Sequence, residues 1–95
     1  MTIVGLTFRN NTLVVQPGEK VSLDITNCAT FQHNFFSPAL KVDPATIIPG
    51  ASAHTTVSFT TPSQPGMYMF WCSTKAAGQK LSHGERGMTG EVIVQ

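Results

Sequence analysis

Four side chains of the sequence together could bind a soft metal ion: His33, Cys72, His83 and Met88. The last three follow one another as Cys72-x10-His83-x4-Met88, and His33 lies one or two expected strands upstream. Copper alternates between a soft monovalent and a harder divalent state. Two imidazoles, one thiolate and a weak axial thioether suit both states, and copper is the common metal that uses such a set. The four donors therefore favour a copper site.

Each donor also has a purely structural interpretation. His33 alone could be a surface histidine or a satisfied core histidine, Cys72 could pack as a small hydrophobe, and Met88 could be plain core. Zinc could recruit Cys28 with Cys72 and two histidines, but the short Cys-x2-4-Cys or His-x3-5-His spacing of structural zinc sites is absent. The remaining histidine, His54, lies in an expected strand with no Cys or Met beside it and is not included among the ligands.

The elements that position these donors are expected to be β-strands. Runs of β-branched and aromatic residues recur about every 8 to 12 residues between Gly, Pro and Asn, and helical periodicity is nearly absent. We expect strands at residues 3–8, 13–15, 21–26, 31–36, 55–59, 67–72 and 91–94. The pattern predicts an all-β fold, an antiparallel sandwich or barrel in which two loops bring His33 beside the three later donors.

Two connections carry few strand signals. Residues 40–50 contain Pro44 and Pro49, which exclude a long helix. Residues 73–87 contain one sizeable hydrophobe, Leu81, and a stretch of this length is expected to be a functional loop. A short helix is an option in either the 40–50 or the 73–82 connection.

Length and composition exclude several classes of protein. The 95 residues are expected to form one domain, 1–95. Six Lys and Arg against five Asp and Glu give no basic field for nucleic acid. No apolar run approaches the ~18 residues that span a bilayer, so we expect no membrane insertion by this chain, although its parent protein could be membrane-tethered. A charged fraction of 12%, against a usual ~25%, suits an exported β-rich protein.

Three stretches of the sequence resemble the cupredoxins, the small blue copper proteins of the plastocyanin, azurin and auracyanin type. They are Asn27 with His33-Asn34-Phe35, then Pro65-Gly66-Met67-Tyr68-Met69-Phe70-Trp71-Cys72, and finally His83-Gly84-Glu85-Arg86-Gly87-Met88-Thr89-Gly90-Glu91-Val92. The likeness extends over essentially the whole chain. It implies a Greek-key β-sandwich or barrel of about seven to eight strands.

The resemblance also implies a role for individual residues. His33 and His83 would be the imidazole ligands of one copper ion, Cys72 the thiolate and Met88 the axial thioether. Asn34 would tie the two ligand loops together through Ser73. Ala76 stands where a binuclear centre would need a second cysteine, so the site should be mononuclear. The segment 76–82 makes the loop before His83 longer than in many members.

If Cys72 binds copper, Cys28 has no disulfide partner and is expected to be a free, buried thiol.

The implied function is one-electron transfer between Cu(I) and Cu(II) in a redox chain, without enzymatic activity. The exposed edge of His83, beside the apolar residues 38–40, would dock redox partner proteins. We expect a monomer in the periplasm or another extracytoplasmic compartment, with its export signal outside this chain. The alternatives are a copper storage or delivery module and a metal-free β-sandwich interaction module.

Overall fold

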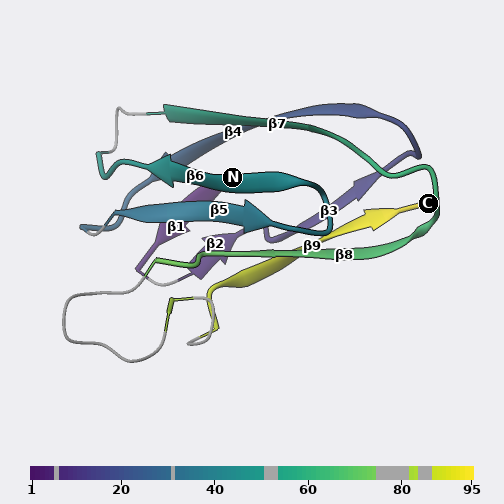
Figure 1. Ribbon diagram of the computed structural model, residues 1–95. Helices are drawn as coiled ribbons and strands as arrows, with labels where there is room; N and C mark the ends of the chain where they lie inside the picture. Colours follow the sequence, from purple (N-terminus) through teal and green to yellow (C-terminus); the bar gives the residue numbers. More distant parts are fainter. Residues whose placement is uncertain (6, 31, 51–53, 75–81, 84–86) are drawn as a thin grey trace.

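The strands of the protein form two sheets that face each other (Figure 1). The computed structural model describes residues 1–5, 7–30, 32–50, 54–74, 82–83 and 87–95, and within them it contains nine strands and no helix. The strands are β1 (Thr2–Val4), β2 (Thr7–Arg9), β3 (Thr12–Val15), β4 (Lys20–Asn27), β5 (His33–Ser37), β6 (Val42–Ile47), β7 (His54–Thr60), β8 (Gly66–Trp71) and β9 (Thr89–Val94). The described part of the chain therefore has no helix that could cross a membrane.

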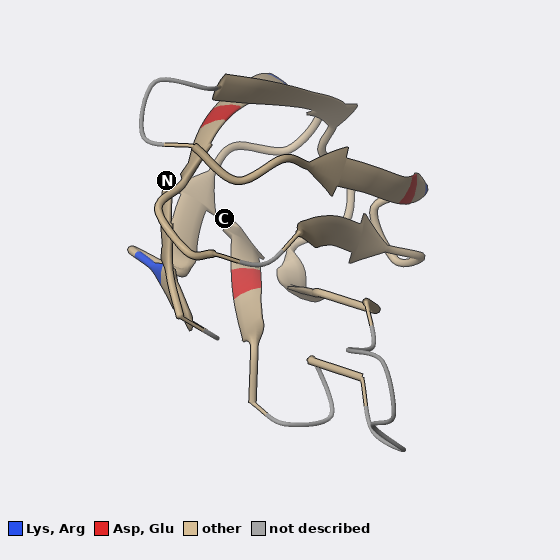
Figure 2. Cartoon of the chain, turned by 90° about the vertical axis from the view of Figure 1, so that its left-hand side faces the viewer, with Lys and Arg blue, Asp and Glu red and all other residues tan. Residues whose placement is uncertain are grey.

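The strand order confirms the expected all-β sandwich. One sheet has the order β2-β1-β4-β7 and the other the order β3-β9-β8-β5-β6. The pairs β1/β4 and β3/β9 are parallel and the other pairs are antiparallel. The chain crosses between the sheets at most of its connections, so strands distant in sequence become neighbours. Few charged residues lie on either sheet, and those present are scattered (Figure 2).

Two expected elements differ from the structure. The strand expected at 3–8 is a hairpin of β1 and β2, and Gly5 adopts a φ of 58° within it.

The 40–50 connection holds strand β6, so the short helix considered there is wrong. Pro44 lies inside β6. It is tolerated because β6 is the edge strand of its sheet, where a missing N–H costs no hydrogen bond to a neighbour. The helix considered at 73–82 falls mostly on residues 75–81, outside the described residues.

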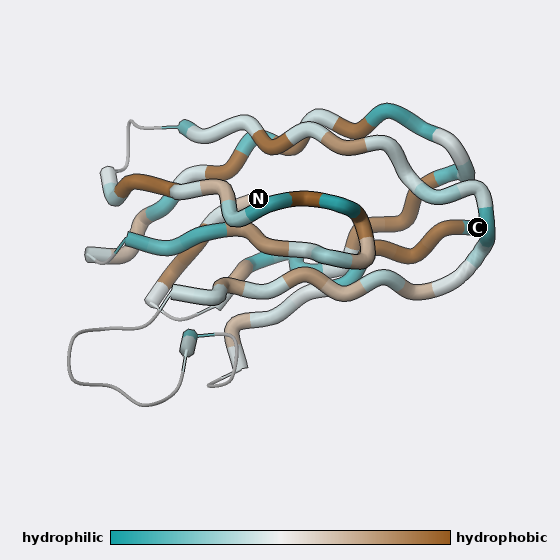
Figure 3. Tube along the Cα trace, viewed as in Figure 1, coloured by the Kyte–Doolittle hydropathy of each residue, from teal (hydrophilic) through white to brown (hydrophobic). Residues whose placement is uncertain are grey.

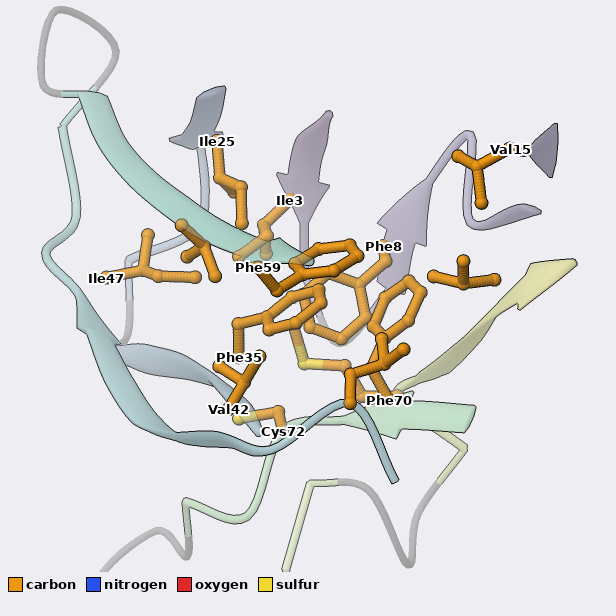
Figure 4. Packing of buried hydrophobic residues seen from close by; sticks show 14 of the residues in the cluster. Ile3, Phe8, Val15, Ile25, Phe35, Val42, Ile47, Phe59, Phe70 and Cys72 are labelled. Atoms are coloured by element: carbon orange, nitrogen blue, oxygen red, sulfur yellow. The ribbon is translucent and has the colours of Figure 1, made fainter. Parts of the chain in front are cut away.

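The core between the sheets is rich in phenylalanine rings. Hydrophobic residues recur along the strands of both sheets (Figure 3). The rings of Phe35 and Phe70 stack at 4.5 Å, and Phe8 meets Phe70 edge-on at 5.3 Å (Figure 4). Cys72 belongs to the same buried cluster and is 0% exposed. A thiol at this position is shielded from water and held by well-packed neighbours.

Gly90 lets β8 and β9 pair tightly just before the chain reaches Cys72. It lies directly opposite Phe70. A Cβ atom at Gly90 would lie 2.6 Å from Cε1 of Phe70 and 2.7 Å from the carbonyl oxygen of Asn11, and both distances are shorter than a Cβ atom can approach another heavy atom. Glycine is therefore required for Phe70 to occupy its place in the core.

Candidate metal centre

The expected donors lie at the end of the sandwich where β5 begins, β8 ends and β9 begins (Figure 1). His33 is the first residue of β5, and Cys72 follows β8 directly. His83 and Met88 lie between β8 and β9. The Cys72 N–H donates to the Met88 carbonyl at 3.1 Å, and the Met88 N–H donates to the His83 carbonyl at 3.0 Å. These backbone bonds hold Met88 beside Cys72 and His83.

Three donor atoms converge in a buried cluster. The Nδ1 atoms of His33 and His83 are 2.9 Å apart, and the Cys72 Sγ lies 3.7 Å from the first and 3.6 Å from the second. The side chains are 0%, 3% and 0% exposed for His33, His83 and Cys72. These three separations define a point about 2.0 Å from each atom, close to the ~2.0–2.3 Å of metal–nitrogen and metal–sulfur bonds. The cluster therefore has the dimensions of a three-coordinate metal site.

Met88 shares the buried environment of these donors. It is 0% exposed and belongs to the same hydrophobic cluster as Cys72. A thioether is a weak and soft donor, and one beside two imidazoles and a thiolate is typical of copper sites rather than zinc sites. The chemistry of the residues present at this end of the core therefore fits copper.

His33 is held as a neutral imidazole. Burial, followed by the neighbouring His83 ring, lowers the pKa of His33 from its ordinary value of 6.5, and the Gly5 backbone raises it by a smaller amount. The buried Nε2 of His33 has no hydrogen-bond partner among the described residues. The Gly5 backbone therefore influences the ring without forming a hydrogen bond to this atom. A neutral ring keeps a lone pair available for a metal at physiological pH. The contribution of Gly5 left no signal in the sequence.

The predicted tie between the two ligand segments is confirmed. Asn34 Nδ2 donates to Ser73 Oγ at 2.9 Å, and the Ser73 N–H donates to Asn34 Oδ1 at 2.8 Å. The Asn34 N–H also donates to the Cys72 sulfur at 3.3 Å. This last bond withdraws electron density from the Cys72 sulfur, and the hydrogen-bonded side chain of Asn34 and residue Ser73 fix the position of that sulfur. Such outer contacts orient metal ligands and adjust their basicity.

Asn27 stabilises the loop that leads to His33. It is fully buried, its Nδ2 donates to the Ile47 carbonyl at 3.2 Å, and its Oδ1 accepts from the Ala29 N–H at 2.9 Å. Ile47 is the register partner of His33. Asn27 therefore joins the end of β4 to the strand beside the first histidine, a role that its sequence position alone did not reveal.

Two expectations about the remaining histidine and cysteine have different outcomes. His54 is exposed, and its Nδ1 forms a hydrogen bond with Thr26 Oγ1 at 2.9 Å. The same Nδ1 lies 3.5 Å from Asp24 Oδ2. It is not part of the donor cluster, as expected. Cys28 was expected to be buried, and this is wrong: it is a free, exposed cysteine immediately after β4. The Cys28 N–H still donates to the Ile3 carbonyl at 2.9 Å, so the backbone remains extended, and the side chain that follows the fully buried Asn27 faces outward.

The expected surroundings of His83 are also wrong. Residues 38–40 follow the far end of β5, and a five-residue strand separates its ends by about 13 Å. Ala39 and Leu40 line a hollow of about 510 Å³ with Lys41, Tyr68 and residues 60–63, away from the donors. The His83 side chain is 3% exposed, so it presents no exposed edge. Among the described residues, two large apolar side chains are exposed at the donor end: Val4 at 40% and Ile48 at 64%.

Solved structures resemble this arrangement, although the sequence matches no known family model and no curated protein. A dithionite-reduced auracyanin from the photosynthetic bacterium Roseiflexus castenholzii matches with a TM-score of 0.71 at 22% identity, over 96% of this chain and 89% of that one. The chain has the cupredoxin fold. Auracyanin B matches this cupredoxin-fold chain with a TM-score of 0.69 at 21% identity, over 99% of it and 88% of auracyanin B. A copper nitrite reductase from Nitrosomonas europaea matches with a TM-score of 0.68 at 26% identity, and there 88% of this chain corresponds to only 30% of the reductase.

Proposed function

We propose that the protein is a mononuclear type 1 copper protein that transfers single electrons, with His33, Cys72, His83 and Met88 as the ligands. The observation that carries this proposal is the convergence of two imidazole nitrogens and a cysteine sulfur around one point at bonding distance from all three. The auracyanin and copper nitrite reductase structures share the fold and support it.

The residues around the centre suit electron transfer. Copper supplies the one-electron exchange between Cu(I) and Cu(II). Burial of His33 and Cys72 excludes water, and the Asn34–Ser73 pair keeps the donor segments in place. Because a rigid ligand set moves little when its charge changes, little energy is spent on reorganisation. We therefore propose a carrier rather than an enzyme, in which no substrate reaches the buried donors.

Redox partners would dock at the donor end of the sandwich. Ile48 is exposed next to Ile47, the register partner of His33, and Val4 is exposed next to Gly5, which acts on the same ring. Both side chains are apolar, and the charged residues on the described strands are few and scattered (Figure 2). An apolar contact close to the donors would shorten the path of the electron. We propose that the carrier acts as a monomer and one domain, 1–95, in the periplasm or another extracytoplasmic compartment.

Copper spectroscopy tests the proposal directly. Adding Cu(II) to the metal-free protein should give an intense visible band from the Cys72 thiolate to the metal. Cys72→Ser should abolish the band, because it removes the thiolate, while Cys28→Ser is the matched control and should keep it. A colourless Cu(II) complex would refute the type 1 site. Electron self-exchange measured on the blue protein should be fast, and slow exchange would instead favour copper storage or delivery.

A further inference from the structure

Strand β8 presents two methionines to solvent. Along the strand, Phe70 points into the core and is 0% exposed, while Met67 and Met69 point outward and are 61% and 37% exposed. The two methionines are two residues apart, so they share the outer face of the sheet. Exposed methionines are unusual in a chain whose other large apolar residues are mostly buried, and this pair places two thioethers side by side.

An acidic residue lies next to the pair. Glu91 of β9 is the antiparallel register partner of Met69, and directly opposed side chains have Cβ atoms about 4.5–5.5 Å apart. The Glu91 Oε1 accepts a hydrogen bond from Thr12 Oγ1 at 3.2 Å, which holds the carboxylate on this outer face. Glu91 thus provides a negative charge beside two neutral sulfur donors.

We propose that Met67 and Met69 form a second metal site, which binds a soft monovalent cation, Cu(I), with the Glu91 carboxylate beside it. Thioethers select Cu(I), whereas a carboxylate alone would favour hard cations. The carboxylate offsets the single positive charge of the ion. That the ion in the cell is Cu(I) rests on the proposed copper function. That the site binds a soft metal ion rests on the residues of β8 and β9 alone.

The spacing of the two methionines allows both sulfurs to reach one ion. Their Cα atoms lie about 6.6 Å apart along an extended strand. Two metal–sulfur bonds of ~2.3 Å span at most about 4.6 Å, so each sulfur must lean about 1 Å toward the other. Methionine has three rotatable side-chain bonds, and solvent exposure leaves them free to do so.

The second site is separate from the buried centre. Met69 precedes Cys72 by three residues, about 10 Å along the chain, and its side chain lies on the opposite face of the sheet from the core. Both sites can therefore be occupied in one molecule. A site of this kind on an exposed face would collect Cu(I) from solution or from a donor protein.

Methyl NMR of the methionines distinguishes the two sites. The chain has four methionines, so ¹³C-methyl labelling gives one signal for each, assigned by substitution. The Cys28→Ser protein is loaded anaerobically with one equivalent of Cu(I) and then titrated with Ag(I), which is soft, monovalent and redox-inert. We expect Cu(I) loading to shift the Met88 signal, and Ag(I) to shift the Met67 and Met69 signals together with one common binding curve.

Conservative variants decide whether the two sulfurs act as a pair. Met67→Leu keeps the apolar volume but removes one thioether, and should weaken Ag(I) binding at Met69 by at least about 10-fold, because metal sites lose this much even when a group that only hydrogen-bonds a ligand is removed. Met69→Leu should do the same at Met67. Glu91→Gln can still accept a hydrogen bond from Thr12 and should weaken binding less than either methionine substitution.

The outcomes separate this proposal from the proposed function. The second site would be overturned if Ag(I) left the Met67 and Met69 signals unmoved. It would also be overturned if the two signals followed different binding curves and each still shifted after the other methionine was replaced. Neither result bears on the buried centre. Conversely, an unmoved Met88 signal on Cu(I) loading would count against Met88 as a ligand while leaving the test at Met67 and Met69 unaffected.

Discussion

Replacement of Asn34 by alanine should lower the free energy of unfolding of the metal-free protein by about 2–3 kcal/mol. The substitution removes both hydrogen bonds between Asn34 and Ser73, at 2.9 and 2.8 Å. Each contributes a net of about 1 kcal/mol, and the Ser73 N–H loses its partner in a partly buried position, which costs up to about 1 kcal/mol more. The backbone N–H of residue 34, which donates to the Cys72 sulfur, is retained.

Ser73→Ala is the matched control, because it removes only the hydroxyl and leaves the bond from its N–H to Asn34 Oδ1. It should cost about 1 kcal/mol. Urea denaturation of the four proteins in the cycle gives the coupling between the two side chains. The double variant should be close in stability to Asn34→Ala, since that variant has already lost both bonds.

Copper binding provides a second measurement for the same variants. If the pair positions the thiolate, Asn34→Ala should weaken copper affinity by about 10- to 100-fold and broaden the visible band, while Ser73→Ala should have a smaller effect. The reasoning would be refuted if Asn34→Ala cost no more stability than Ser73→Ala. It would also be refuted if Ser73→Ala weakened copper affinity more than Asn34→Ala.

Two further predictions concern the core and the donor cluster. Gly90→Ala should destabilise the protein by about 1–3 kcal/mol, because the new Cβ overlaps the Phe70 ring, and thermal unfolding that matches the parent would show that the ring can move aside. Lowering the pH from 7.5 to 5 should reduce the stability of the metal-free protein: the folded-state pKa of His33 lies below its ordinary 6.5, so the unfolded chain binds more protons in this window. Urea midpoints for the parent and His33→Gln measure this, and equal slopes with pH for the two proteins would contradict it.

The sequence alone predicted most of the strands and the identities of the clustered donors. Alternation of apolar and polar residues, as in β4 and β7, is a local property, because successive side chains of a strand point to opposite faces. The Asn34–Ser73 tie followed from resemblance to a known family. Strand β6 was missed because Pro44 normally interrupts a sheet, and whether a strand is an edge strand depends on its neighbours.

Other features depended on how the strands are arranged in space. The burial of Cys28 was misjudged, and residues 38–40 were assigned to the wrong end of the sandwich, because both depend on where the chain turns relative to the donors. The outward pair Met67 and Met69 could not be distinguished from core residues in an apolar run, since the register of β8 alone sets which side faces water.

The sequence by itself determined which chemistry is available, since two imidazoles, a thiolate and a thioether limit the metals that could be bound. Only the tertiary structure decided that these groups meet. His33 and His83 are 50 residues apart in sequence and 2.9 Å apart in space. They meet because β5 begins where β8 ends and β9 begins, and that arrangement results from pairing between strands distant in the chain.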